Sequence, residues 1–483
     1  MSSWLLVDNP IFYIAAILYF ALFVVLAWKN FRLAVGLFIL LLPTYLIRFS
    51  LGGIVSTVLE ITFLSIFLVW VIHYSRYDLK EIRAFVGRHK YFFVALVLFF
   101  LASFVSVFSH EHPFGSDCVW RPYFLEPLLL FFMLIGRGEE IKGPDLINFF
   151  AYSTIPISAL ALLQKFLNWL FPADFWHIPP ERVTSFFNSP SAVGLYLGPL
   201  IVLMGALLYK KAHLRHILEE EEKIVSPSMW SLPQRKLWRG IKGGTLLLGA
   251  AFMLAMLALI FSFSRGAWVA LGAGSFFFAL LLGWKKAAAV LAGFGLLLFF
   301  FAPSLRPSAA LSEPAGKTRA ILWEYTLHTL AVSPGRLVFG AGLNRLYSQA
   351  WNSYFKYKKA EPVVYSHDLL LNFLAETGLA GAVSFVALIV GAFWIVNRKR
   401  KDDDIILGAG VMSALTVIVI HGLIDVPYFK SDLAMEFWIL MSFMSRSKWI
   451  SDFTIWTEVN KLMWRKKQPV IVPVLKEPPW ING

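Results

Sequence analysis

Long apolar runs alternate with short polar connections through most of this 483-residue chain. An α-helix needs about 20 apolar residues to cross a bilayer, and most of the runs approach that length. The candidate spans are 11–28, 33–47, 51–73, 91–109, 123–136, 147–170, 191–209, 244–263, 266–284, 287–302, 368–396, 405–424 and 432–445. Runs 123–136 and 432–445 are short for a span. The pattern predicts an all-α, polytopic integral membrane protein of about 12–13 transmembrane helices.

The polar connection 303–367 is longer than any other that we place outside the membrane. It divides the chain into parts that differ in hydrophobicity and charge. These parts are an N-terminal transmembrane bundle (1–302), a large external loop (303–367), C-terminal transmembrane helices (368–445) and a basic cytoplasmic tail (446–483).

Composition and charge support a membrane protein rather than a nucleic-acid-binding protein. Hydrophobic residues make up 58% of the chain, more than a soluble core can bury. The net charge is +14, but Lys and Arg concentrate in alternate loops, which the positive-inside rule places in the cytoplasm. We therefore expect membrane lipids as partners, no nucleic acid, and an external position for 303–367. Cys118 is the only cysteine, so neither an intrachain disulfide nor a Cys-based metal site is possible.

Several ionisable residues stand at the outer ends of the predicted spans. Arg265 lies in the tightest outer connection, between the small residues Ser264 and Gly266, which leave room for a ligand oxygen. Arg182 lies in the outer loop 171–190, where Glu181 could pair with it. The sequence His110-Glu111-His112 could suggest a metal, but adjacent loop residues rarely converge as ligands, and we expect no metal site.

Other charged residues are expected to have structural roles. Glu60 falls inside a predicted span and should pair within the protein, because a lone charge in lipid is costly. Arg121 and Glu126 are expected to pair with each other. His421 and Asp425 are four residues apart on one predicted helix face, and a helix-terminal hydrogen bond is the expected arrangement.

At residues 180–440 the pattern resembles the O-antigen ligase and O-antigen polymerase superfamily, bacterial inner-membrane C-type glycosyltransferases. The most specific part is His367-Asp368-Leu-Leu-Leu371, followed after six residues by Gly378; Asp368 departs from the family's usual Asn. The other similar stretches are Ser264-Arg265-Gly266-Ala267, Arg319 to Trp323 with Pro334 and Gly340-Ala-Gly342, and Arg182 through Asn188 to Pro190. The resemblance implies short helices within the external loop.

The resemblance also implies a reaction and roles for these residues. The donor would be a glycan on undecaprenyl diphosphate, and an acceptor hydroxyl or amide would attack its anomeric carbon with inversion. Histidine suits removal of the acceptor proton, and arginine suits the leaving diphosphate. His367 is thus the expected base or acceptor orienter, with Arg182 and Arg265 as the diphosphate clamp. Weaker candidates for substrate binding are Arg319, Asp368, Asn188 and Trp323.

The acceptor remains open at this point. Transfer to lipid A–core would make the protein a ligase, transfer to another lipid-linked glycan a polymerase, and transfer to protein an O-oligosaccharyltransferase. We expect no cofactor and no metal requirement, with the active site on the periplasmic side of the inner membrane. A non-catalytic lipid-glycan transporter is disfavoured, since the candidate groups gather on one side and we see no inverted repeat.

Overall fold

A computed structural model gives the fold and describes residues 10–51, 54–108, 119–167, 182–222, 232–301, 314–346, 365–402 and 405–445. Nearly all secondary structure in these ranges is helical, and one short antiparallel hairpin, β1 (Arg48–Leu51) and β2 (Ile54–Thr57), is the only sheet among them. The predicted all-α class is confirmed.

Six helical segments among the described residues are long and apolar enough to cross a membrane. These are Val58–Arg88, Lys90–Val107, Gly143–Phe166, Pro190–His216, Gly244–Phe261 and Leu369–Arg398. Four more apolar helices have 10–17 residues: Tyr13–Lys29, Phe31–Leu40, Arg265–Leu281 and Ile405–His421. The chain is therefore a multi-pass membrane protein in which several predicted spans are shorter than a bilayer is thick.

The N-terminal third contains two spans that are interrupted. Helix α1 (Pro10–Lys29) precedes α2 (Phe31–Leu40), and Pro43 then lies in a short 3₁₀ turn, Leu42–Leu46, so the predicted span 33–47 ends early. The hairpin occupies the start of the predicted span 51–73, and α3 (Val58–Val69) follows it. Thr57 and Glu60 form a capping box, which explains why this helix begins at Val58.

The remaining helices follow in chain order. They are α4 (Ser75–Arg88), α5 (Lys90–Val107), α6 (Glu126–Gly136), α7 (Gly143–Phe166), α8 (Pro190–Glu222), α9 (Leu232–Phe261), α10 (Arg265–Leu281), α11 (Lys285–Phe301), α13 (Pro314–Ala331), α14 (Pro334–Phe339), α16 (Leu369–Asp402), α17 (Ile405–His421) and α18 (Ser431–Ser442). Single π-helical turns, Trp70–Tyr74 and Arg121–Leu125, lead into α4 and α6.

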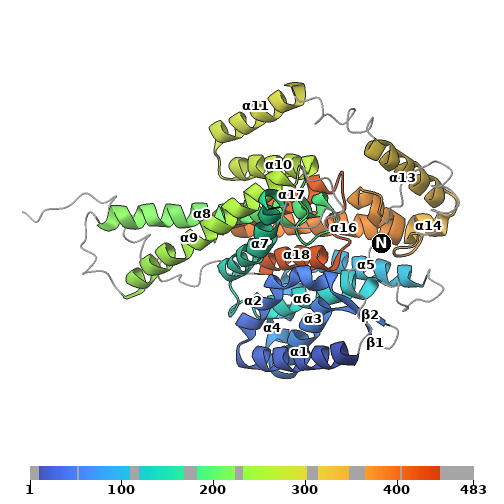
Figure 1. The fold of residues 1–483 in the computed structure, drawn as a ribbon, viewed down its shortest axis with the longest axis horizontal. Coiled ribbons are helices and arrows are strands. Elements are labelled where there is room, and N and C mark those ends of the chain that lie inside the picture. Colours follow the sequence, from blue (N-terminus) through green and yellow to red (C-terminus); the bar gives the residue numbers. More distant parts are fainter. Residues whose placement is uncertain are drawn as a thin grey trace, which may run out of the picture.

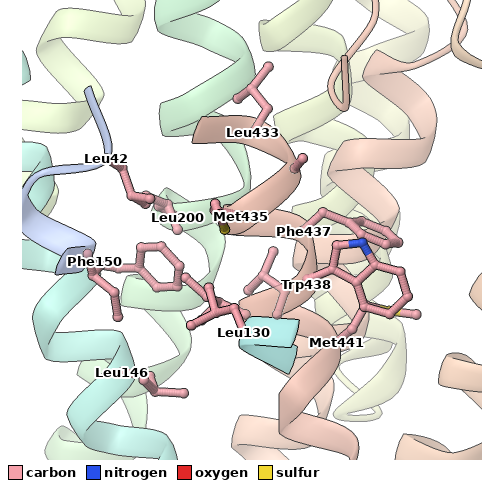
Figure 2. Packing of buried hydrophobic residues seen from close by; sticks show 14 of the residues in the cluster. Leu42, Leu130, Leu146, Phe150, Leu200, Leu433, Met435, Phe437, Trp438 and Met441 are labelled. Carbon is pink, nitrogen blue, oxygen red and sulfur yellow. The ribbon is translucent and has the colours of Figure 1, made fainter. Parts of the chain in front are cut away.

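Helix α18 lies in the centre of the apolar core (Figure 2). Its Trp438 is fully buried, and Leu130 of α6, Phe150 of α7 and Leu200 of α8 surround the helix. Trp438 also donates through Nε1 to the Tyr428 hydroxyl at 3.1 Å, and that hydroxyl donates to the Tyr123 carbonyl at 2.8 Å. The segment between α17 and α18 is therefore attached to a rigid part of the bundle.

The two ends of the bundle differ (Figure 1). The C-terminal part of α8 and the N-terminal part of α9 extend from one end, whereas α13, α14 and the β1–β2 hairpin lie at the other. The extended parts of α8 and α9 belong to the most basic predicted cytoplasmic loop, residues 210–242. The candidate site is built at the second end.

Candidate active site

The turn between α9 and α10 positions Arg265. Helix α9 ends at Phe261, Phe263 adopts a left-handed backbone with φ 49°, and Arg265 begins α10 behind the N-cap residue Ser264. Trp268 donates through Nε1 to the Leu259 carbonyl at 3.2 Å across the turn. Arg265 is thus held at a helix N-terminus, where anions are favoured by the helix dipole.

Arg182 is fixed against the same turn. Its Nε donates to the Ser262 carbonyl at 3.1 Å and its terminal nitrogen donates to the Phe263 carbonyl at 3.3 Å. Burial, and then the positive charge of Arg265, lower the pKa of Arg182 below its ordinary value. The two predicted clamp residues are therefore close enough for their charges to repel, and a bound anion would relieve that repulsion.

The segment after Arg182 is rigid although it has no regular secondary structure. Gln164 of α7 accepts through Oε1 from the backbone amides of Thr184 at 2.7 Å and Ser185 at 3.0 Å. Asn188 follows as an exposed residue in the turn before α8. No hydrogen bond or ion pair links it to the described residues of the site, so its predicted binding role stays a prediction.

His367 lies immediately before α16 with a left-handed backbone of φ 53°. Asp368 accepts through Oδ1 from the Leu371 amide at 2.8 Å and so caps the helix. Burial raises the pKa of Asp368, and hydrogen bonds from the amides of Leu371 and Leu370 oppose that rise. This carboxyl group is therefore engaged mainly with the helix start, which fixes the neighbouring His367.

Asp425 faces His367, and this pairing was not predicted from the sequence. Nδ1 of His367 lies 3.4 Å from Oδ1 of Asp425, a charge contact too long and too poorly aligned for a strong hydrogen bond. Burial alone would raise the pKa of Asp425, but His367, His421 and Lys430 together lower it below its ordinary value. The carboxylate is thus ionised and held beside the imidazole.

The Asp425 turn packs directly on the start of α10. A Cβ atom added to Gly266 would lie 2.4 Å from Cδ1 of Ile424 and 3.3 Å from Cδ2 of His421. The Leu369 amide also donates to the Gly422 carbonyl at 2.6 Å, which joins the start of α16 to the end of α17. These contacts bring the region of Arg265 and the region of His367 and Asp425 into one site. His421 and Asp425 are joined through the main chain, since the Asp425 amide donates to the His421 carbonyl at 3.0 Å.

Helix α13 places the two remaining candidates over this site. Trp323 donates through Nε1 to the Ser366 carbonyl at 2.9 Å, one residue before His367. Arg319 lies one turn earlier on α13. The described part of 303–367 therefore places an aromatic residue beside His367, and the binding role expected of Arg319 stays a prediction.

Helix α14 is attached to α16 through two glycines. Gly340 and Gly378 have φ 80° and 69°, and a Cβ atom on Gly340 would lie 2.4 Å from the Glu376 carbonyl oxygen. A Cβ atom on Gly378 would lie 2.3 Å from the Val338 carbonyl oxygen. Gly378 breaks α16 into a short first part, 369–377, and a long second part, 379–402, so the predicted span 368–396 is not one straight helix.

Backbone strain coincides with this site. The non-glycine residues with left-handed backbones in the described ranges are Ser185, Phe263, Asn344 and His367. Ser185 and His367 lie in stretches singled out from the sequence, Phe263 directly precedes the stretch that begins at Ser264, and Asn344 follows Gly342 by two residues. Such conformations cost about 1–3 kcal/mol each and persist where the surrounding structure fixes them, often at functional sites.

The described residues contain no group of three or more His, Asp, Glu or Cys side chains that could hold a metal ion. The sequence His110-Glu111-His112 lies outside these residues. Metal independence therefore stays a prediction to be tested.

Residues 250–386 match the family model described as O-antigen ligase. The matched segment includes Arg265, Arg319, Trp323 and His367, whereas Arg182 lies before it and Asp425 after it. A search of curated proteins gave no match. The family match agrees with the resemblance seen in the sequence.

Proposed function

We propose that this multi-pass membrane protein acts as an O-antigen ligase and moves a glycan from undecaprenyl diphosphate to lipid A–core on the periplasmic face of the inner membrane. The family supports a ligase- or polymerase-type glycosyltransferase role. The observation on which the proposal depends is the arrangement of two adjacent arginines beside a histidine–aspartate pair. The arginines suit a leaving diphosphate, and the pair suits an acceptor proton.

Arg182 and Arg265 would hold the donor diphosphate. A guanidinium group donates two parallel hydrogen bonds to phosphate oxygens and stays charged at any working pH. Main-chain carbonyls hold the Arg182 side chain, and Arg265 stands at the first position of α10. A clamp built on such fixed elements needs little reorganisation when charge develops on the leaving group.

His367 would accept the proton of the acceptor. Its Nδ1 faces Asp425, so Nε2 is the nitrogen available to the substrate. The acceptor oxygen forms a bond to the anomeric carbon as its proton moves to Nε2, and the bond between that carbon and the diphosphate oxygen breaks. Asp425 would orient the ring and stabilise the imidazolium, as carboxylates do for catalytic histidines.

Reconstitution tests this proposal. The purified full-length protein in lipid nanodiscs is incubated with undecaprenyl-diphosphate-linked glycan and, separately, with lipid A–core, a second lipid-linked glycan and an acceptor protein. Glycan-modified lipid A–core is the expected product. Elongated lipid-linked glycan would instead show a polymerase, and glycosylated protein an O-oligosaccharyltransferase. No product with any acceptor would overturn the assignment as a glycosyltransferase.

A further inference from the structure

Helices α3 and α4, joined by a π-helical turn, form one continuous helical segment, Val58–Arg88. An exposed stripe runs along this segment, made of residues three or four positions apart. Its members are Leu64, Leu68, Ile72, Arg76, Lys80 and Arg83. The first three form an apolar part and the last three a cationic part. The stripe therefore changes from apolar to charged within one turn, as expected where a helix leaves the hydrocarbon region of a bilayer.

The opposite face of α4 fixes the direction of this stripe. Asp78 is buried and accepts through Oδ2 from Nε1 of Trp70 at 2.8 Å. A Cβ atom on Gly136 of α6 would lie 2.4 Å from Cβ of Asp78, so the two helices are in close contact. Phe85, two turns later, is also buried and packs edge-on against Phe131 of α6, with 6.0 Å between ring centroids. With this face packed on α6, the cationic part of the stripe points away from the bundle.

The cations of the stripe differ from other arginines of the N-terminal helices. Arg32 lies 2.5 Å from Asp145, and Arg137 contacts two carboxylates. No ion pair or hydrogen bond joins the three cationic side chains of the stripe to any residue that the structure describes. Glu81, the exposed acidic residue of α4, also makes no ion pair with a described residue. The stripe thus keeps positive charge that a ligand could compensate.

We infer that this stripe binds anionic phospholipids, with the phosphatidylglycerol headgroup as the type, in the cytoplasmic leaflet. The positive-inside rule assigns the basic connection 74–90 to the cytoplasmic side. One lipid matches both parts of the stripe, since its acyl chains contact the apolar part and its phosphate contacts the cationic part. An acidic protein would match only the cations. Tyr77, beside Arg76, is 78% exposed, and tyrosine is enriched at membrane–water interfaces.

A matched pair of double variants tests the inference. Lys80→Gln/Arg83→Gln removes two exposed charges of the stripe. Lys285→Gln/Lys286→Gln removes two exposed charges at the start of α11, which are adjacent in sequence and so do not follow one helix face. A cation near an anionic membrane surface contributes about fivefold in affinity. The stripe variant should therefore bind phosphatidylglycerol at α4 about 25-fold more weakly, and the α11 variant should bind it as the wild type does.

Photolabelling of the full-length protein in phosphatidylcholine nanodiscs measures this binding. The probes are trace phosphatidylglycerol and, separately, trace phosphatidylcholine, each with a diazirine near the glycerol end of an acyl chain. Unlabelled phosphatidylglycerol competes, and labelled peptides are identified by mass spectrometry. Preferential labelling of α4 by phosphatidylglycerol, with about 25-fold more competitor needed in the stripe variant alone, supports the inference. Equal labelling by the two lipids would show ordinary bilayer contact and overturn it, and so would equal losses in both variants, which would show an effect of net charge.

A soluble acidic polymer, polyglutamate, is the second competitor. It should displace phosphatidylglycerol from α4 only at a much higher concentration of negative charge, because it has no part that contacts the apolar residues of the stripe. Displacement at equal charge concentration would overturn the inference, since the stripe would then suit an acidic protein segment. None of the stripe residues belongs to the candidate site, so labelling can support or overturn this inference whatever the outcome of the transfer assays.

Discussion

Arginines at two places in this bundle have different partners. Arg121 lies 2.6 Å from Glu60 and 3.0 Å from Glu126, so two buried carboxylates compensate its charge. Arg182 instead donates to two main-chain carbonyls and lies beside Arg265. Carbonyl dipoles orient a guanidinium without cancelling its charge. The first arrangement suits stability, and the second keeps positive charge for a ligand.

The two regions also differ in their backbones. The Arg121 network rests on a capped helix and a π-helical turn, and no residue of these elements has a left-handed backbone. The Arg182 and Arg265 region includes the left-handed residues Ser185 and Phe263, which are bulkier than the glycine such conformations favour. Strain of this kind fits a region shaped for binding. Variants in the two regions should therefore fail in different ways.

The largest effect is expected at His367. His367→Ala should reduce glycan transfer by about 10²–10⁴-fold, the usual contribution of a general base, while donor binding through Arg182 and Arg265 persists. Transfer and binding of the lipid-linked donor are measured separately in nanodiscs. Lost donor binding in a folded variant would assign His367 to the donor side, and full transfer would remove it from the mechanism.

Arg265 should show the next largest loss. Arg265→Lys should fail almost as badly as Arg265→Ala, by about 10²-fold or more, since lysine keeps the charge but not the two-pronged geometry. Thermal unfolding of the purified variant should stay near that of the wild type. Near-normal transfer by the lysine variant would indicate that Arg265 is only an interfacial anchor.

Arg121→Ala should behave in the opposite way. Removing one partner of a buried ion pair leaves uncompensated carboxylates and can lower the free energy of unfolding by about 3–5 kcal/mol. Because Arg121 is partly exposed, we expect a loss of stability at the lower end of this range. The unfolding temperature and membrane level should fall, whereas transfer per folded molecule should change little. A stable Arg121→Ala protein without activity would contradict the division between the two regions.

Much of this difference between the Arg121 region and the candidate site, but not all of it, was predicted from the sequence. Apolar length revealed the helical class. Short motifs singled out Arg182, Arg265 and His367 as candidates, and their roles stay predictions. The pairing of Arg121 with Glu126 was also predicted, as was a protein partner for Glu60. Asp425 was missed as the partner of His367, because 58 residues and two helices separate them and only tertiary packing brings them together. Its spacing from His421 was the available signal.

Helix interruptions were harder to predict than helix positions. The hydrophobic run 368–396 continues through Gly378, since hydropathy is insensitive to backbone direction. The bend depends on a close contact with Gly340, 38 residues earlier in the chain, which a single sequence does not reveal. The β1–β2 hairpin was missed for a related reason: it directly precedes the apolar helix α3, and hydropathy extended the predicted span 51–73 back into the hairpin.

A smaller effect is expected from Asp425→Asn. Because the folded pKa of Asp425 lies below its ordinary value, its carboxylate stabilises the fold above about pH 4, and this contribution is lost as pH falls through the folded value. The variant should lack that acid-dependent part of stability. Transfer should fall by about tenfold or more, because the amide no longer orients the imidazole of His367 for proton transfer. An unchanged transfer rate in the folded variant would show that Asp425 is only a packing partner.

The smallest expected effect is that of metal removal. If the diphosphate is neutralised by Arg182 and Arg265, a divalent cation has no remaining charge to compensate, and EDTA should leave the transfer rate unchanged. The measurement compares wild-type protein before and after EDTA treatment and dialysis. Arg121→Ala is a useful control, since its lower stability should not make it sensitive to EDTA. Activity that is lost with EDTA and restored by Mg²⁺ or Mn²⁺ would show that Arg182 and Arg265 do not suffice to neutralise the diphosphate. The two arginine regions would then differ in substrate positioning rather than in charge compensation.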